Sequence, residues 1–142
     1  MIVPDINLLL YAQVTGFAQH ARARQWWEDL LNGQEEVGLA APTVFGVVRL
    51  ATSRAVLDRP LTVGDALTRV GDWMAVPHVH FAVPGPRHLE IAFGLLRELG
   101  TAANLTTDVQ LAALAIEYQG ERHSNDTDFG RFPGLRWVNP LH

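Results

Sequence analysis

Short apolar runs alternate along the chain with longer segments in which apolar residues recur every three or four positions. The short runs have the length of buried strands, while the longer segments have the period of helices that bury one face. This pattern predicts five strands, at residues 2–5, 37–41, 80–83, 122–124 and 135–138. It predicts helices at residues 6–12, 20–31, 42–53, 63–73, 86–99 and 105–116.

Residues that start or stop helices agree with these segments. We expect Thr62 to cap one helix, Pro86 to be the first residue of another, and Gly100 to end that helix. Helices that alternate with short apolar strands indicate a parallel sheet that is covered on both faces. The predicted fold class is therefore α/β: a single three-layer α/β/α domain over residues 1–142, with a central, mainly parallel sheet of about five strands.

Composition excludes several kinds of chemistry. All 11 basic residues are Arg, so no Lys is present for a P-loop, a Schiff base or a phospho-aspartate site that pairs Lys with the aspartate. The chain also has no Cys, which rules out disulfides, thiolate zinc sites and a cysteine nucleophile.

The charge and the N-terminal sequence limit the partners. A net charge of −4 has the wrong sign for a broad basic face that holds nucleic acid, so such a substrate would need another source of positive charge. Asp5 and Asn7 interrupt the first apolar run, which is unlike a signal peptide, and no apolar stretch approaches the roughly 20 residues of a membrane span. We expect a cytoplasmic protein that does not contact the membrane.

Four acidic residues fall at positions that the predicted fold brings together. Asp5 follows the first strand, Asp126 and Asp128 follow the fourth, and Asp108 lies in the first turn of the preceding helix. Ligands of parallel α/β sheets bind at the carboxyl ends of the strands, so we expect the four carboxylates to share one cleft. Four like charges repel one another unless a cation lies between them, and oxygen ligands suit Mg²⁺ or Mn²⁺.

Each of these acids also has a structural interpretation. Asp5 would cap the helix that follows it, and Asp108 would complement the dipole of its own helix. Asp126 or Asp128 would form a turn or a cap before Phe129. Taken one at a time the structural interpretation is favoured, and only the four positions together favour a metal site.

Several segments resemble the successive motifs of PIN-domain ribonucleases. These are VPDINLLLYA at residues 3–12, NLTTDVQLAALA at 104–115 and SNDTDF at 124–129. The segment FPGLRWVNPL at 132–141 is similar to the C-terminal strand of the VapC toxin branch. The resemblance spans essentially the whole chain, and it implies a metal-dependent endoribonuclease that is the toxin of a bacterial type II toxin–antitoxin pair.

The resemblance also implies roles for particular residues. Asp5, Asp108 and Asp126 would ligate Mg²⁺, with Mn²⁺ as a substitute, and Asp128 would complete the catalytic set. The supporting polar side chains would be Asn7, Thr107 and Ser124. The implied partners are an RNA substrate, a VapB-type antitoxin and a second copy of the chain in a homodimer.

One position departs from the family pattern. PIN toxins usually carry a Glu on the helix after the second strand, and here that segment reads GVVRLAT, with Gly46 at the expected Glu. The loss of one carboxylate would weaken a second metal, leave a one-metal site or reduce activity, and the sequence does not choose among these. The alternative function is a catalytically weakened PIN-like interaction module.

The tryptophans have the phasing of core or interface residues rather than of bases stacked on RNA. The helix that contains Trp26 and Trp27 is amphipathic, and we expect it to offer an apolar groove to a partner helix, with Trp27 as a contact residue.

Overall fold

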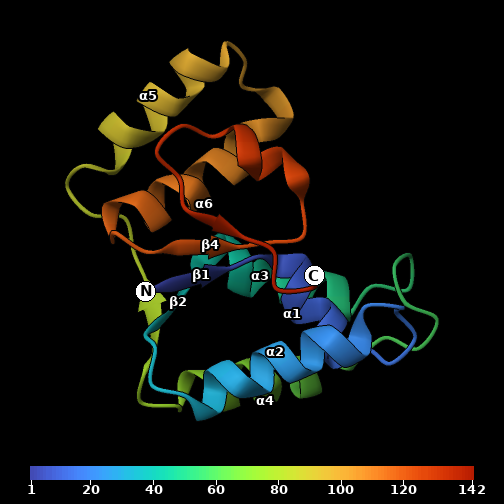
Figure 1. Ribbon diagram of the computed structural model, residues 1–142. Helices are drawn as coiled ribbons and strands as arrows, with labels where there is room; N and C mark the ends of the chain where they lie inside the picture. Colours follow the sequence, from blue (N-terminus) through green and yellow to red (C-terminus); the bar gives the residue numbers. More distant parts are fainter.

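The computed structural model describes residues 1–142, and its centre is a sheet of parallel strands between two layers of helices (Figure 1). The strands are β1 (Ile2–Pro4), β2 (Val37–Ala40), β3 (Val79–Ala82), β4 (Glu121–His123) and β5 (Trp137–Val138). The helices are α1 (Ile6–Gln13), α2 (His20–Asn32), α3 (Ala41–Ala51), α4 (Val63–Met74), α5 (His88–Leu99) and α6 (Thr106–Glu117), with short 3-10 helices η1 (Ala103–Leu105) and η2 (Thr127–Arg131). The predicted three-layer α/β/α class is confirmed.

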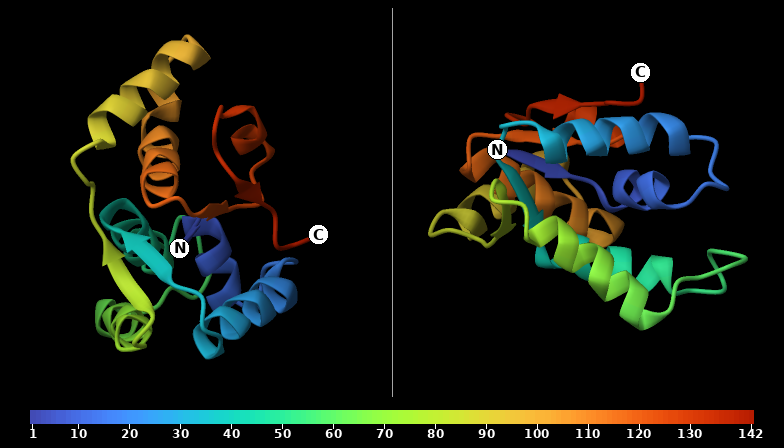
Figure 2. Two further views of the ribbon diagram at one scale, coloured as in Figure 1. Left: turned by 60° about the vertical axis from the view of Figure 1, so that its left-hand side comes forward. Right: turned by 90° about the horizontal axis from the view of Figure 1, so that it is seen from below.

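The strand order β3-β2-β1-β4-β5 creates a switch point between β1 and β4. From β1 the chain proceeds through β2 to β3 at one edge, then returns to place β4 on the other side of β1. Figures 1 and 2 show α2 and α4 on one side of the strands and α5 and α6 on the other. Open α/β sheets bind ligands where the winding direction reverses, so the carboxyl ends of β1 and β4 are the expected ligand site.

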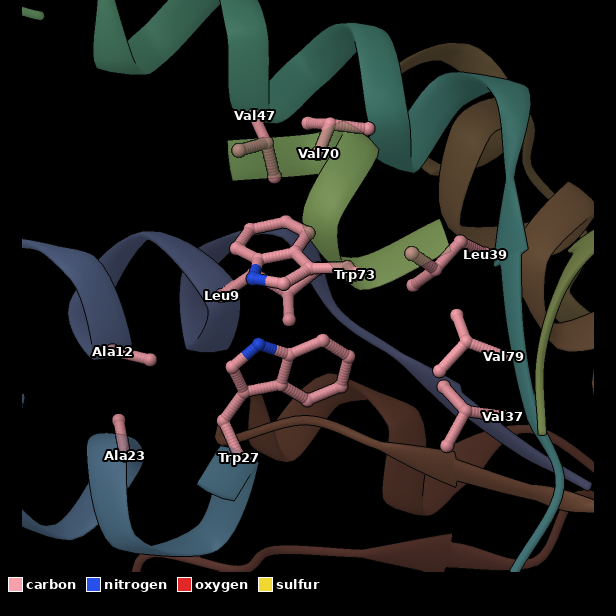
Figure 3. Packing of buried hydrophobic residues seen from close by; sticks show 10 residues of the cluster. All are labelled: Leu9, Ala12, Ala23, Trp27, Val37, Leu39, Val47, Val70, Trp73 and Val79. Carbon is pink, nitrogen blue, oxygen red and sulfur yellow. The ribbon is translucent and has the colours of Figure 1, made fainter. Parts of the chain in front are cut away.

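The larger core cluster lies on the face that α1 to α4 cover, and it centres on two tryptophans (Figure 3). Trp27 of α2 and Trp73 of α4 meet edge to face, with 5.4 Å between ring centroids. Only 2% of Trp27 is exposed, so the expectation that Trp27 contacts a partner helix is wrong. The neighbouring Trp26 is half-buried and donates a hydrogen bond from Nε1 to His123 Nδ1 at 3.0 Å.

The helix ends match the sequence in two cases and differ in one. Thr62 accepts a hydrogen bond from the Asp65 amide, and Gly100 adopts the left-handed conformation with φ of 71°, as expected. Helix α5, however, begins at His88 rather than at Pro86. The amides of residues 85 and 87 both donate to the Glu117 carboxylate of α6, and this long-range contact holds the intervening turn out of the helix. None of the helices combines the length and the apolar character needed to cross a membrane.

Candidate active site at the ends of β1 and β4

The Asp5 carboxylate is held by the strand beside it and not by its own helix. β1 and β4 are aligned so that Pro4 lies opposite His123, and the Asp5 amide donates to the His123 carbonyl at 2.9 Å. Ser124, which is fully buried, donates its hydroxyl to Asp5 Oδ2 at 2.6 Å. Asp5 occupies the N-cap position of α1 but makes no side-chain cap bond, so the capping interpretation of this residue is wrong.

The Ser124 hydroxyl also connects Asp5 with Asp126. Its oxygen accepts a hydrogen bond from the Asp126 amide at 3.0 Å, so one hydroxyl separates the Asp5 carboxylate from the Asp126 backbone. Asp126 Oδ1 in turn accepts from the Asp128 amide at 2.9 Å and caps η2. The structural interpretation of Asp126 as a cap is therefore correct for one of its oxygens.

Asp108 faces the same group of charges from α6. It lies in the first turn of α6, as predicted, and is half-buried. Burial raises the pKa of the Asp108 carboxyl above its usual value, and the neighbouring Asp5 raises it further. Arg122 opposes this increase, while Asp126 and Asp128 add smaller contributions in the same direction as Asp5. The other three predicted acids therefore all act electrostatically on Asp108.

Arg122 is a residue of this site that the sequence analysis missed. It lies on β4 with none of its surface exposed, and its Nη1 donates to the carbonyls of Val3 at 3.3 Å and Pro4 at 2.8 Å. Its Nη2 lies 3.3 Å from Asp5 Oδ1, and the guanidinium carbon lies 4.9 Å from the centroid of the Phe129 ring. An Arg within a predicted buried strand, just ahead of the acidic loop, was the available signal.

The remaining predicted residues lie on the solvent-exposed side of the acidic site. Asp128 is exposed, and so are Asn7 and Thr107. The hydrogen bonds to the carboxylates come from the Ser124 hydroxyl and the Asp128 amide, and neither Asn7 nor Thr107 supplies one. Of the three supporting polar side chains, the structure brings only Ser124 into contact with the carboxylates.

The donor set fits a hard divalent cation by its chemistry. The acids that surround Asp108 offer carboxylate oxygens, which are the ligands that Mg²⁺ and Mn²⁺ prefer. No three His, Cys, Asp or Glu side chains are close enough together to form a finished coordination group. The acids are near enough to one another to raise the pKa of Asp108, but they form no preformed coordination group.

Helix α3 contributes no acid to this site, and at the expected Glu position Gly46 packs against Ile6 of α1. A Cβ atom at residue 46 would lie 2.6 Å from Ile6 Cδ1 and 3.1 Å from Ile6 Cγ1. The side chain of Ile6, which directly follows Asp5, thus fills the space into which a longer residue at 46 would extend. Glycine at residue 46 and the bulky Ile6 are therefore sterically compatible, whereas Glu at residue 46 would require Ile6 to move.

We expect this contact to determine the effect of Gly46→Ala. Alanine in a helix interior is favoured over glycine by about 1 kcal/mol, but the contact with Ile6 cancels or reverses that gain in the wild-type background. In the Ile6→Val background the nearest atom is absent, and the same substitution should stabilise the protein by about 1 kcal/mol. Urea unfolding of the four proteins measures this coupling, and equal effects in both backgrounds would contradict it.

Comparison with known proteins identifies the class to which this fold and site belong. Residues 2–135 match the profile of the PIN domain, so the chain belongs to the PIN domain family. Ribonuclease VapC33 of Mycobacterium tuberculosis is 57% identical over 141 residues, with 99% of each chain covered. Ribonuclease VapC37 of the same species is 41% identical over 140 residues, which cover 99% of this chain and 97% of that protein. The chain therefore falls in the VapC branch of the family.

Solved structures of related proteins share the fold at low sequence identity. VapBC2 from Rickettsia felis has a TM-score of 0.70 at 14% identity, with 98% of each chain covered. VapC20 of Mycobacterium tuberculosis, described as a toxin that cleaves the sarcin–ricin loop, has a TM-score of 0.63 at 15% identity, with 96% of this chain and 99% of that chain covered. At these identities the likeness establishes the fold alone.

Proposed function

We propose that the protein is a metal-dependent endoribonuclease, the toxin of a toxin–antitoxin pair, which hydrolyses RNA phosphodiester bonds. Asp5, Asp108 and Asp126 would hold Mg²⁺ or Mn²⁺, and Asp128 would act beside them. The observation that carries this proposal is the hydrogen-bonded chain from Asp5 through Ser124 to Asp126, with Asp108 in the same electrostatic field at the switch point of the sheet. The two relatives of highest stated identity are named as ribonucleases, which supports RNA as the substrate.

The residues of the site would have different roles in catalysis. Ser124 orients the Asp5 carboxylate, and Asp126 Oδ2, unlike Oδ1, accepts no hydrogen bond and is the more open oxygen for a ligand. A bound divalent cation supplies a positive charge for the phosphate and a water of lowered pKa. The acidic site of a chain with net charge −4 repels RNA on its own, so the cation would also be needed for the substrate to approach.

The proposal includes a VapB-type antitoxin and a homodimer. The structure from Rickettsia felis is a VapBC assembly, and this supports an antitoxin partner. Phe45, Phe81 and Phe93 expose 71%, 53% and 50% of their surfaces, and burial of these side chains would stabilise an interface of either kind.

Metal removal tests the proposed activity. We expect the purified protein to cleave RNA with Mg²⁺ or Mn²⁺, to stop when EDTA is added and to resume when excess metal is restored. Asp5→Asn should lose this metal response, whereas Asp72→Asn should keep it, because Asp72 is an exposed acid of α4. Cleavage that continues in EDTA would refute the metal dependence. A folded wild-type protein that cleaves no RNA with either metal would favour the interaction module, to which the Ile6–Gly46 packing points.

A further inference from the structure

Arg122 is a fully buried cation whose hydrogen-bonding capacity is only partly used. Nη1 donates to two β1 carbonyls, but Nε and Nη2 have no hydrogen-bond partner. Nη2 nevertheless lies 3.3 Å from Asp5 Oδ1. A buried charge is costly unless opposite charges compensate it, and the acids that act on Arg122 are Asp5, Asp108 and Asp126. Arg122 therefore belongs to the acidic site electrostatically, although it lies on the core side of Asp5.

We propose that Arg122 is a positioning residue that fixes the Asp5 carboxylate and serves as a permanent counter-charge, so that the acidic site takes one divalent cation. This inference rests on the metal-dependent function proposed above. Because none of Arg122 is exposed, it cannot reach an RNA phosphate, and its effect must pass through Asp5 and the charge of the site.

The contacts of the Asp5 carboxylate favour a single ion. A carboxylate that bridges two cations presents both of its oxygens to metal. Asp5 Oδ1 lies 3.3 Å from the buried Arg122 Nη2, so a cation bound at Oδ1 would stand close to the charge of the guanidinium. Asp5 Oδ2 accepts one hydrogen bond from Ser124 and keeps a lone pair for a cation. Only one of the two oxygens is therefore favourable for a divalent ion.

The charge of the site supports the same conclusion. The four carboxylates and Arg122 together leave an excess of negative charge that one divalent cation largely offsets. A second divalent ion would give the site a net positive charge and would meet the fixed guanidinium across Asp5. A second cation and the guanidinium are both positive, and like charges within a few ångströms of each other in a partly buried site repel strongly.

The number of bound ions tests this inference. Isothermal titration of the metal-free, full-length protein with Mn²⁺ should give one ion per chain. Arg122→Met, which removes the charge but keeps an unbranched apolar chain, should take up a second Mn²⁺. Arg122→Lys keeps the charge and should remain at one ion, while its kcat for RNA falls about tenfold at unchanged KM because Asp5 is held less firmly.

Arg136→Met is the matched control. It removes the same charge from an exposed Arg whose guanidinium donates to the Gln119 carbonyl and not to the acids, so it should bind one ion. Two ions on the wild type, or one ion on a folded Arg122→Met variant, would overturn the inference. If Arg122→Met does not fold, the wild-type count and the Arg122→Lys variant still decide. Absence of any Mn²⁺ binding by the wild type would instead refute the proposed function, and this inference with it.

Discussion

Asp108→Asn is expected to reduce RNA cleavage by about a hundredfold or more and, in metal-free buffer at pH 7, to raise the melting temperature. The two effects have one cause. Burial and the neighbouring Asp5 raise the pKa of Asp108 in the folded protein above its ordinary value of 3.8. Between 3.8 and the raised pKa the folded state binds more protons than the unfolded state, so stability is lost as pH rises through that window. Asparagine at residue 108 cannot ionise, so it removes the cost of a buried charge and, at the same time, the proposed metal ligand.

Thermal melts of wild type and Asp108→Asn at pH 7 and at acidic pH, in EDTA, measure this difference. The advantage of the variant should shrink below the ordinary Asp pKa, where both proteins are uncharged at residue 108. Asp72→Asn removes an exposed acid of α4 and should change neither cleavage nor the pH dependence at residue 108. Added Mg²⁺ should raise the melting temperature of the wild type more than that of Asp108→Asn.

The opposite result would restore the structural interpretation of Asp108. An acid in the first turn of a helix stabilises it through the helix dipole by about 0.3–1 kcal/mol. If Asp108 had only this role, Asp108→Asn would lower the melting temperature and leave cleavage intact.

The sequence predicts those features of the fold and site that follow from local pattern. The sheet follows from short apolar runs between periodic segments, and the meeting of Asp5 with Asp126 follows from two acids that end parallel strands. The position of Asp108 follows from the parallel topology. The helix that leads into a parallel strand begins at the edge of the sheet where that strand ends, and Asp108 lies in the first turn of such a helix. The spacing along the chain and the parallel topology are sufficient to predict each of these positions.

Features that depend on contacts distant in sequence were not predicted. The role of Arg122 depends on its register beside β1, which places two carbonyls and Asp5 around its guanidinium. The late start of α5 depends on Glu117, 30 residues beyond Arg87. The packing of Gly46 on Ile6 requires the close approach of two helices. None of these leaves a periodic signal in the chain.

Trp27→Ala is expected to destabilise the protein by about 3–5 kcal/mol, because it opens a cavity in the larger core cluster. Trp27 is 2% exposed and packs against Trp73, and both rings lie between α1, α3 and the sheet residues shown in Figure 3. Its Nε1 is buried without a hydrogen-bond partner, so Trp27→Phe should cost much less than Trp27→Ala. Urea unfolding followed by circular dichroism measures both changes.

Phe45→Ala provides the comparison for Trp27→Ala, because Phe45 is 71% exposed and its truncation should change stability by no more than about 0.5 kcal/mol. If Trp27→Ala proved as mild as Phe45→Ala, residue 27 would not be part of the core, and its helix face would be available to a partner. If the large loss is observed, reduced antitoxin binding by Trp27→Ala reports unfolding and does not locate an interface. Antitoxin contacts are then better sought with substitutions of exposed residues such as Phe45, which leave the core intact.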